Sequence, residues 1–275
     1  MTKKHTPSSR EAALQALLAY ERNGIFLQES LDQWIRTTTP LPADRSLAYE
    51  ISYGVMRRKT TLEWYAHTLL PEQKLKLKRK ERFILIIAIY QHLFMDRIPP
   101  YAIANEAVNL ANIFCHKRFS SFLNAILRRF ADTPFSPPQG HTPEEMSIRY
   151  SFPTCYIKDL LTCYTTEETT AILEASNAPG VTMIRSRSSA DPFDVFTLDD
   201  NAVIHDYTSS PDYYIQNITS VELTKALASV TPPPQHILDI CAAPGGKALL
   251  AHDIFPSAHL HLNDLTEKKC SFLEE

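Results

Sequence analysis

The chain contains 275 residues, of which 44% are hydrophobic and 21% charged, and its net charge is −3. This composition is typical of a globular protein with one large domain or a few small ones, and it excludes disordered and fibrous folds. The sequence has no apolar run long enough for a membrane span and no secretory leader after Met1, so we expect a cytoplasmic protein that makes no membrane contact. The cysteines include no Cys-x-x-Cys pair, so no metal site is predicted.

Charge is divided unevenly along the chain. Residues 1–131 contain 20 Lys and Arg against 11 Asp and Glu, a balance of +9, whereas residues 132–275 contain 8 against 20, a balance of −12. A basic half on an otherwise acidic chain favours contact with a nucleic acid. Arg57-Arg58-Lys59 and the lysine-rich stretch Lys74, Lys76, Lys78, Arg79 and Lys80 are candidate phosphate contacts. Either cluster alone would favour a solvated helix face, but both lie in the basic half of the chain, which favours RNA contact.

The first 131 residues are predicted to form an all-α bundle, because apolar residues recur there at helical spacing. The clearest examples are Leu14, Leu17 and Leu18; Leu47, Ile51 and Val55; and Phe119, Phe122, Leu123, Ile126, Leu127 and Phe130. Residues 81–94 are apolar on most sides, which predicts a central, buried helix. Pro99 and Pro100 end that helix, because proline has no amide donor.

A proline-rich linker over residues 133–140 is predicted to follow this first domain. Residues 141–230 then indicate a small α+β domain. Its predicted elements are a helical stretch over 143–164, short strands over 181–185, 202–205 and 213–215, and a helix over 220–229.

The last segment, 231–275, is predicted to begin a parallel α/β sheet. A strand over 236–240, a turn with paired glycines, a helix over 247–255 and a strand over 259–263 make the opening β-α-β unit of a doubly wound fold. Such sheets are normally covered on both faces, which two strands alone cannot achieve. We therefore expect the segment to be the N-terminal part of an incomplete domain in a truncated chain.

The turn between these two strands is the most informative part of the sequence. Paired glycines at the start of a helix allow a ligand to approach the main chain. A phosphate-binding P-loop needs Gly and Ser or Thr where the chain has Cys241 and Ala248, and no Gly-x-Gly-x-x-Gly motif is present. These absences favour a ligand with a ribose but no polyphosphate, such as S-adenosylmethionine, with Asp264 accepting from its ribose hydroxyls. The alternative is a tight turn that binds nothing.

Cys241-Ala-Ala-Pro-Gly-Gly-Lys247 resembles the cofactor motif of the Sun family of RNA cytosine-C5 methyltransferases. Similar segments extend over nearly the whole chain: Thr61-Leu-Glu-Trp64, Arg97-Ile-Pro-Pro100, Phe122-Leu-Asn-Ala-Ile-Leu-Arg-Arg129, Arg149-Tyr-Ser-Phe-Pro153 and Glu174-Ala-Ser-Asn177. They resemble the bacterial members of the family that modify small-subunit ribosomal RNA. The resemblance implies a NusB-like helical domain over 1–131, a small RNA-contacting α+β subdomain over 141–230 and the start of a Rossmann-like methyltransferase domain over 231–275.

The resemblance also implies a set of cofactor-binding residues. They are Cys241, Ala242, Ala243, Pro244, Gly245, Gly246, Lys247 and Asp264. Three positions depart from the family pattern: Cys155 replaces the usual Trp, Asn217 replaces an acid and Arg187 replaces the usual Asn.

Methylation at cytosine C5 requires a cysteine thiolate that adds to C6 before the methyl group is transferred. In the family this cysteine lies in a Thr-Cys-Ser motif downstream of the cofactor loop, and the sequence up to Glu275 contains no such motif. No catalytic residue is therefore assigned, and the chain is expected to be inactive alone. Cys155 and Cys163 are interpreted as buried packing residues, because free cysteine behaves as a small hydrophobe.

The sequence thus predicts a monomeric, cytoplasmic enzyme that uses S-adenosylmethionine to methylate cytosine C5 in small-subunit ribosomal RNA and does not bind DNA. The main alternative is a non-catalytic RNA-binding module of NusB type, acting in transcription antitermination or ribosome assembly. A third possibility is a methyltransferase that acts on protein or a small molecule, which the basic half of the chain disfavours.

Overall fold

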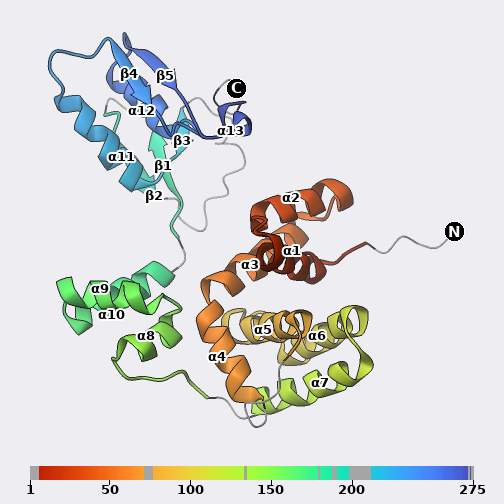
Figure 1. Ribbon diagram of the computed structural model, residues 1–275. Helices are drawn as coiled ribbons and strands as arrows, with labels where there is room; N and C mark the ends of the chain where they lie inside the picture. The colour runs from red at the N-terminus through yellow and green to blue at the C-terminus, as the bar shows by residue number, and fades with distance from the viewer. Residues whose placement is uncertain are drawn as a thin grey trace. The chain divides into compact units, whose positions relative to one another are not determined.

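The computed structural model describes residues 6–70, 77–132, 135–178, 180–187, 191–197, 212–271 and 273. It divides into two compact units, Met1–Ala178 and Pro179–Glu275 (Figure 1). The helices of the first unit are α1 (Ser9–Asn23), α2 (Leu27–Thr38), α3 (Pro42–Arg57), α4 (Lys59–Leu69), α5 (Arg79–Phe94), α6 (Pro100–Phe114), α7 (Lys117–Asp132), α8 (Pro143–Tyr150), α9 (Thr154–Cys163) and α10 (Thr166–Asn177).

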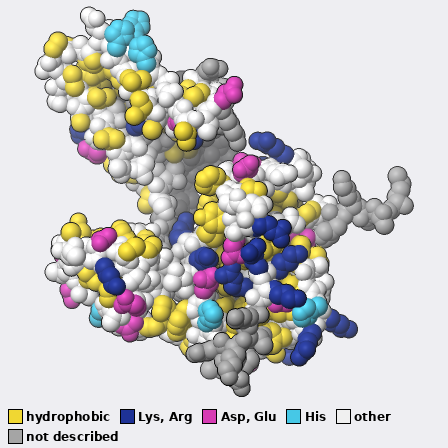
Figure 2. Space-filling view, viewed as in Figure 1, with side chains coloured by type: hydrophobic (Ala, Val, Ile, Leu, Met, Phe, Trp, Pro, Cys, Tyr) yellow, Lys and Arg dark blue, Asp and Glu magenta, His cyan; other side chains and the backbone are white. Residues whose placement is uncertain are grey.

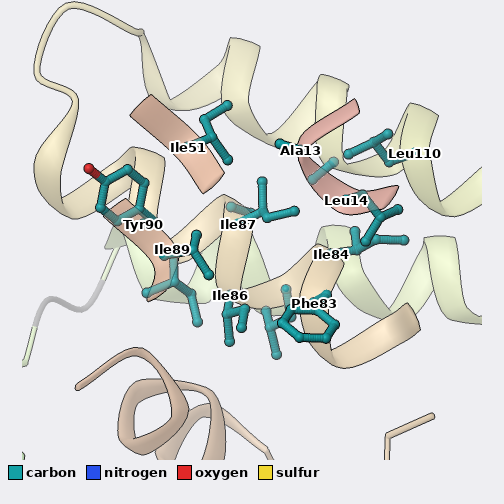
Figure 3. Packing of buried hydrophobic residues seen from close by; sticks show 14 of the residues in the cluster. Ala13, Leu14, Ile51, Phe83, Ile84, Ile86, Ile87, Ile89, Tyr90 and Leu110 are labelled. Carbon is teal, nitrogen blue, oxygen red and sulfur yellow. The ribbon is translucent and has the colours of Figure 1, made fainter. Parts of the chain in front are cut away.

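Helix α5 forms the centre of the bundle, as the sequence predicts. Eight of its apolar residues are no more than 4% exposed, and they include Phe83, Ile84, Ile86, Ile87 and Tyr90. Helix α5 contacts α1, α3, α4, α6 and α7, and Figure 3 shows these five side chains packed together with Leu14 of α1 and Ile51 of α3. A helix that is apolar on most sides is stable only when neighbours surround it, which explains why its sequence lacks a polar face.

Helices α8 to α10 complete the first unit and differ from the prediction. The helical stretch expected over 143–164 is two helices, because Ser151 adopts a left-handed conformation (φ 60°) and Pro153 follows. Proline restricts the preceding residue to extended conformations, so α8 cannot continue through Phe152 into α9. Helix α8 packs against α4, where Thr61 Oγ1 donates to Ile148 O at 2.6 Å. The residues of the predicted 141–230 domain are thus divided between the two units, and the three-domain division stays a prediction.

The second unit contains two small sheets. Its elements are β1 (Met183–Ser186), β2 (Val195–Thr197), β3 (Tyr213–Ile215), α11 (Ile218–Lys225), the 3-10 helix η3 (Ala226–Ser229), β4 (His236–Asp239), α12 (Gly246–Ile254), β5 (His259–Leu262) and α13 (Glu267–Ser271). One sheet is antiparallel, in the order β2-β1-β3. The strand predicted over 202–205 lies outside the described residues, and β2 was not expected.

Strands β4 and β5 pair in parallel, with His236 opposite His259 and Asp239 opposite Leu262, and α12 connects them. The predicted β-α-β order is therefore confirmed. Helix α12 packs against both strands. On the opposite face Leu238 and Ile240 are 66% and 65% exposed. Among the described residues, no helix is both long and apolar enough to span a membrane.

Candidate functional site

The loop from Cys241 to Lys247 connects β4 to α12 and is held by its own backbone. Ala242 N donates to Asn263 O at 2.9 Å, and Gly245 N donates to Ala242 O at 2.7 Å. Gly245 is the N-cap of α12 with φ 111°, a conformation that favours glycine, and no side chain caps this helix end. The first amide groups of α12 therefore have no side-chain acceptor and are available to an electron-rich ligand.

Gly246 lies against a neighbouring strand rather than against an open space. A Cβ atom added there would be 2.8 Å from Tyr214 Cε1. Tyr214 donates from its hydroxyl to Pro244 O at 3.2 Å, and Gln216 Nε2 donates to Gly246 O at 3.0 Å. The close approach that the paired glycines predict is thus made by Tyr214, a residue of the chain itself. The roles of Tyr214 and Gln216 could not be predicted from the sequence, because no local sequence pattern shows which distant segment packs against the loop.

Two charged residues at the ends of the loop bind each other. Lys247 Nζ lies 3.2 Å from Asp239 Oδ2 and donates to Cys241 O at 2.7 Å. Asp239 Oδ1 accepts from Cys241 N at 3.1 Å. The ammonium group of Lys247 is therefore neutralised within the loop, and its contacts stabilise the path of the chain from β4 to α12.

Asp264 lies beside this loop, as predicted, at the end of β5. Its side chain is 6% exposed. Oδ2 accepts from Ala243 N at 3.0 Å, whereas Oδ1 accepts from Leu265 N at 2.7 Å and lies 3.1 Å from Lys269 Nζ. The hydrogen bond from the Leu265 amide, followed by those from Lys269 and Ala243, lowers the pKa of Asp264. The carboxylate thus joins β5 to the loop, and its binding to a ribose stays a prediction.

A cavity of about 210 Å³ opens between the loop and the start of α11. Its lining residues are Tyr214, Ile215, Gln216, Asn217, Ser220, Ala242, Ala243, Pro244, Gly246 and Lys247. Asn217 is the N-cap of α11, since its side chain accepts from Thr219 N at 2.8 Å. Asn and Asp cap helices equally well, which explains why the departure from the family's acid preserves this local structure. The cavity brings together five of the predicted loop residues with polar groups from outside the motif.

A buried ion pair lies behind the cavity. Arg185 of β1 is 0% exposed, and its Nη1 lies 2.7 Å from Asp253 Oδ2 of α12. Arg187 Nη2 lies 3.0 Å from the other oxygen of Asp253. Burial acts to raise the pKa of Asp253, but hydrogen bonds from Arg187 and Arg185 outweigh it and lower that pKa overall. Arg187, which departs from the family's usual Asn, therefore ties the antiparallel sheet to α12.

Comparison with known proteins shows which families and folds the chain resembles. Residues 7–132 match the model of the NusB family. Ribosomal RNA small subunit methyltransferase B of Escherichia coli O9:H4 (strain HS) is 26% identical over 83% of this chain, and so is the protein of the same name from Shigella boydii serotype 18. The chain spans 57% of the length of each of these relatives. The crystal structure of PH0851 matches with a TM-score of 0.63 at 15% identity, covering 100% of this chain and 67% of that chain.

The chain resembles ribosomal RNA small subunit methyltransferase B. This finding confirms the resemblance that the sequence motifs indicate, and the match to the NusB family confirms the NusB-like helical domain. PH0851 shares the fold, which at 15% identity is all that this likeness shows.

The cysteines differ from the sequence interpretation. Cys155 and Cys163 were expected to be buried, but both are exposed. Helix α9 buries Ile157, which is 0% exposed, and the two cysteines project from other sides of the helix. Cys241 in the loop is exposed and Cys270 on α13 is half-buried. Among the described residues no group of three or more His, Cys, Asp or Glu side chains is arranged to hold a metal ion.

Ion pairs neutralise part of the basic clusters of the NusB-like domain. Glu21 of α1 binds Arg79, at 2.8 Å, and Arg82. Glu63 of α4 binds Arg82 at 2.7 Å and Lys59 at 3.8 Å. Arg79 and Lys59 therefore have protein partners, so treating the two clusters as uniform phosphate contacts is too broad. Lys74 and Lys76 lie outside the described residues.

A smaller basic surface lies where the first turns of α5 and α7 meet. We define it by the exposed residues Lys78, Lys80, Lys117 and Arg118, which form no ion pair with another described residue. His116 Nε2 lies 3.3 Å from Glu81 Oε1, and Lys80 Nζ lies 5.8 Å from the centre of the Phe114 ring. The first contact joins the starts of α5 and α7, and the second joins α5 to the end of α6. Figure 2 shows Lys and Arg side chains gathered on one side of this domain, with acidic side chains among them.

Proposed function

We propose that the chain acts in the methylation of cytosine C5 in small-subunit ribosomal RNA, with S-adenosylmethionine as methyl donor. The observation that carries the proposal is the loop from Cys241 to Lys247, bonded to Asp264 and bordering a cavity, in a chain that resembles ribosomal RNA small subunit methyltransferase B. S-adenosylmethionine, when bound, supplies a methyl group activated by a positively charged sulfur. The thiolate nucleophile is not assigned to any residue of this chain.

The residues around the cavity fit one end of this cofactor. The cavity is about 210 Å³, below the roughly 300–1,000 Å³ of typical small-molecule sites. It is lined by polar side chains of Gln216, Asn217 and Ser220 and by the first residues of α12. Uncapped amides at a helix start favour a carboxylate. Asp264 does not line the cavity itself but bonds to Ala243, which does, and its Oδ2 has a second lone pair that a hydroxyl could use.

Calorimetry with S-adenosylhomocysteine tests the cofactor proposal. We expect weak binding to the 275-residue chain, because the described cavity encloses only part of the ligand. Ser220→Phe places a ring in the cavity and should abolish binding, whereas Thr219→Phe, one residue away and exposed, should leave binding unchanged. Absence of binding to the unmodified chain, or equal binding by the Ser220→Phe variant, would contradict the proposal.

The proposed RNA contact is the basic surface of Lys78, Lys80, Lys117 and Arg118. Four cations without acidic partners attract phosphate groups without reading sequence. The surface lies within the part of the chain that matches the NusB family. We therefore propose that this domain docks the ribosomal RNA substrate, while the second unit holds the methyl donor.

A second function is favoured by a specific observation at the glycine turn. Tyr214 fills the space beside Gly246, and both oxygens of Asp264 already accept hydrogen bonds from the protein. These contacts are consistent with a loop that only stabilises the fold and binds no cofactor. The chain would then be a NusB-type RNA-binding module that acts in transcription antitermination or ribosome assembly. RNA binding by the unmodified chain, together with no calorimetric signal from S-adenosylhomocysteine, would favour this second function over the first.

A further inference from the structure

A line of hydrogen bonds runs from inside the antiparallel sheet to the glycine turn of the loop. Arg185 Nε donates to Gln216 Oε1 at 2.9 Å, and Gln216 Nε2 donates to Gly246 O at 3.0 Å. Arg185 is 0% exposed and Gln216 is 5% exposed. Both bonds are therefore shielded from water, where a hydrogen bond restricts its partners more strongly than it does at the surface.

The chemistry of the partners fixes the orientation of the Gln216 amide. A guanidinium group only donates hydrogen bonds, and a backbone carbonyl only accepts them. The oxygen of Gln216 must therefore face Arg185 and its NH₂ group must face Gly246. Rotating the amide by half a turn would break both bonds. The position of Gly246 O thus depends on where Arg185 lies.

The same arginine also holds the far end of α12. Arg185 Nη1 lies 2.7 Å from Asp253 Oδ2 and 3.4 Å from Pro192 O. Gly246 and Asp253 are seven residues apart on α12, so at 1.5 Å per residue their positions lie about 10 Å apart along the helix axis. One buried guanidinium therefore contacts α12 directly near its end and, through Gln216, at its first residue.

We infer that Arg185 and Gln216 are positioning residues that set the geometry of the cofactor loop. Gln216, in the wall of the cavity, holds the carbonyl of Gly246, and Arg185 holds Gln216. This arrangement keeps the first amides of α12 directed at the cavity before any ligand arrives. The inference rests on the proposed function in one respect, namely that the loop binds S-adenosylmethionine.

The Gln216→Glu substitution separates positioning from general stability. The new carboxylate still accepts from Arg185, and its charge strengthens that contact. It has no hydrogen to donate to Gly246 O, so only the last bond of the line is lost. A merely structural role predicts that the loop and the whole fold change stability together. A positioning role predicts that the loop loosens while the melting temperature stays the same or rises.

Hydrogen exchange by NMR on the full chain measures the loop directly. The reporters are the amides of Gly245 and Leu249, which donate to Ala242 O and Gly245 O. We expect Gln216→Glu to accelerate their exchange and to weaken S-adenosylhomocysteine binding by up to about tenfold, the effect of one hydrogen bond. Gln216→Met, which loses both bonds at similar volume, should do the same. The control is Arg187→Met. This substitution removes a contact to Asp253 of α12 but leaves the hydrogen bonds from Arg185 to Gln216 and from Gln216 to Gly246 intact.

The two measurements distinguish the inference from the proposed function. Unchanged exchange of these amides in both Gln216 variants, or equal acceleration in Arg187→Met, would overturn the inference. Accelerated exchange confined to the Gln216 variants supports it. If the unmodified chain binds no S-adenosylhomocysteine, the proposed cofactor fails, and the exchange rates still decide whether Gln216 positions the loop.

Discussion

The basic surface leads to a quantitative prediction about RNA binding. Lys117→Gln/Arg118→Gln removes two of its four cations. Neither residue forms an ion pair with another described side chain, and both are exposed, so the substitutions should leave the fold intact. The matched control, Lys59→Gln/Arg79→Gln, removes the same charge from the same domain. Its side chains, however, are paired with Glu63 and Glu21.

The magnitude follows from counterion release. If the four cations each neutralise one phosphate of a duplex, the slope of log K against log salt is about −3.6, and removing two should reduce it to about −1.8. Between 50 and 200 mM salt the unmodified chain would then lose roughly 150-fold in affinity and the variant roughly 12-fold. The control should keep most of the slope, because its cations are already neutralised by carboxylates.

Fluorescence anisotropy with a labelled small-subunit rRNA hairpin, titrated at four salt concentrations, measures these slopes. Circular dichroism confirms that each variant is folded. A slope for Lys117→Gln/Arg118→Gln equal to that of the unmodified chain would refute the assignment of this surface. An equal loss of slope in the control would show that total charge, rather than the position of the unpaired cations, governs binding.

Three further predictions concern stability. Gly54→Ala should lower the melting temperature, because the added Cβ would overlap the ring of Tyr90; we expect a cost of about 1–3 kcal/mol, and a change below a few tenths would contradict that packing. Thr61→Val should cost about 1–2 kcal/mol and increase proteolysis after α8, since Ile148 O loses its donor; protection equal to the unmodified chain counts against this contact. Because the pKa of Asp253 is lowered in the fold, its stabilising effect is present above its unfolded pKa of about 3.9 and is lost as pH falls through the lower folded value. Asp253→Asn should therefore remove part of the fall in melting temperature that the unmodified chain shows below about pH 4, and an unchanged fall in this variant would refute the prediction.

The elements predicted best from sequence are those whose patterns are local. The apolar residues of α5 leave no polar face, and the order of β4, α12 and β5 follows from strand, paired glycines and helix in succession. The break between α8 and α9 also has a local cause in Pro153, which was overlooked. Helix α10 was missed although Thr165 and Glu168 form a capping box at its start.

The residues of the candidate site likewise include some that a local sequence pattern predicts and some that it does not. The motif and Asp264 could be found because they occupy fixed positions within one β-α-β unit. Tyr214, Gln216 and Arg185 could not be found, since their roles depend on the antiparallel pairing of β1 with β3 and on how that sheet packs against α12. The exposure of Cys155 could not be read from residue type, because burial on α9 depends on which side of the helix meets its neighbours.

One face of the parallel strand pair exposes apolar side chains among the residues that the structure describes, and this has a practical consequence for handling the protein. Leu238 on β4 and Ile240 just after it are both exposed, and burying apolar surface gains roughly 25 cal/mol for every Å² removed from water. Copies of the chain should therefore adhere through this face as concentration rises. Ammonium sulfate strengthens such adhesion, so this face should contribute to the salting-out of the chain.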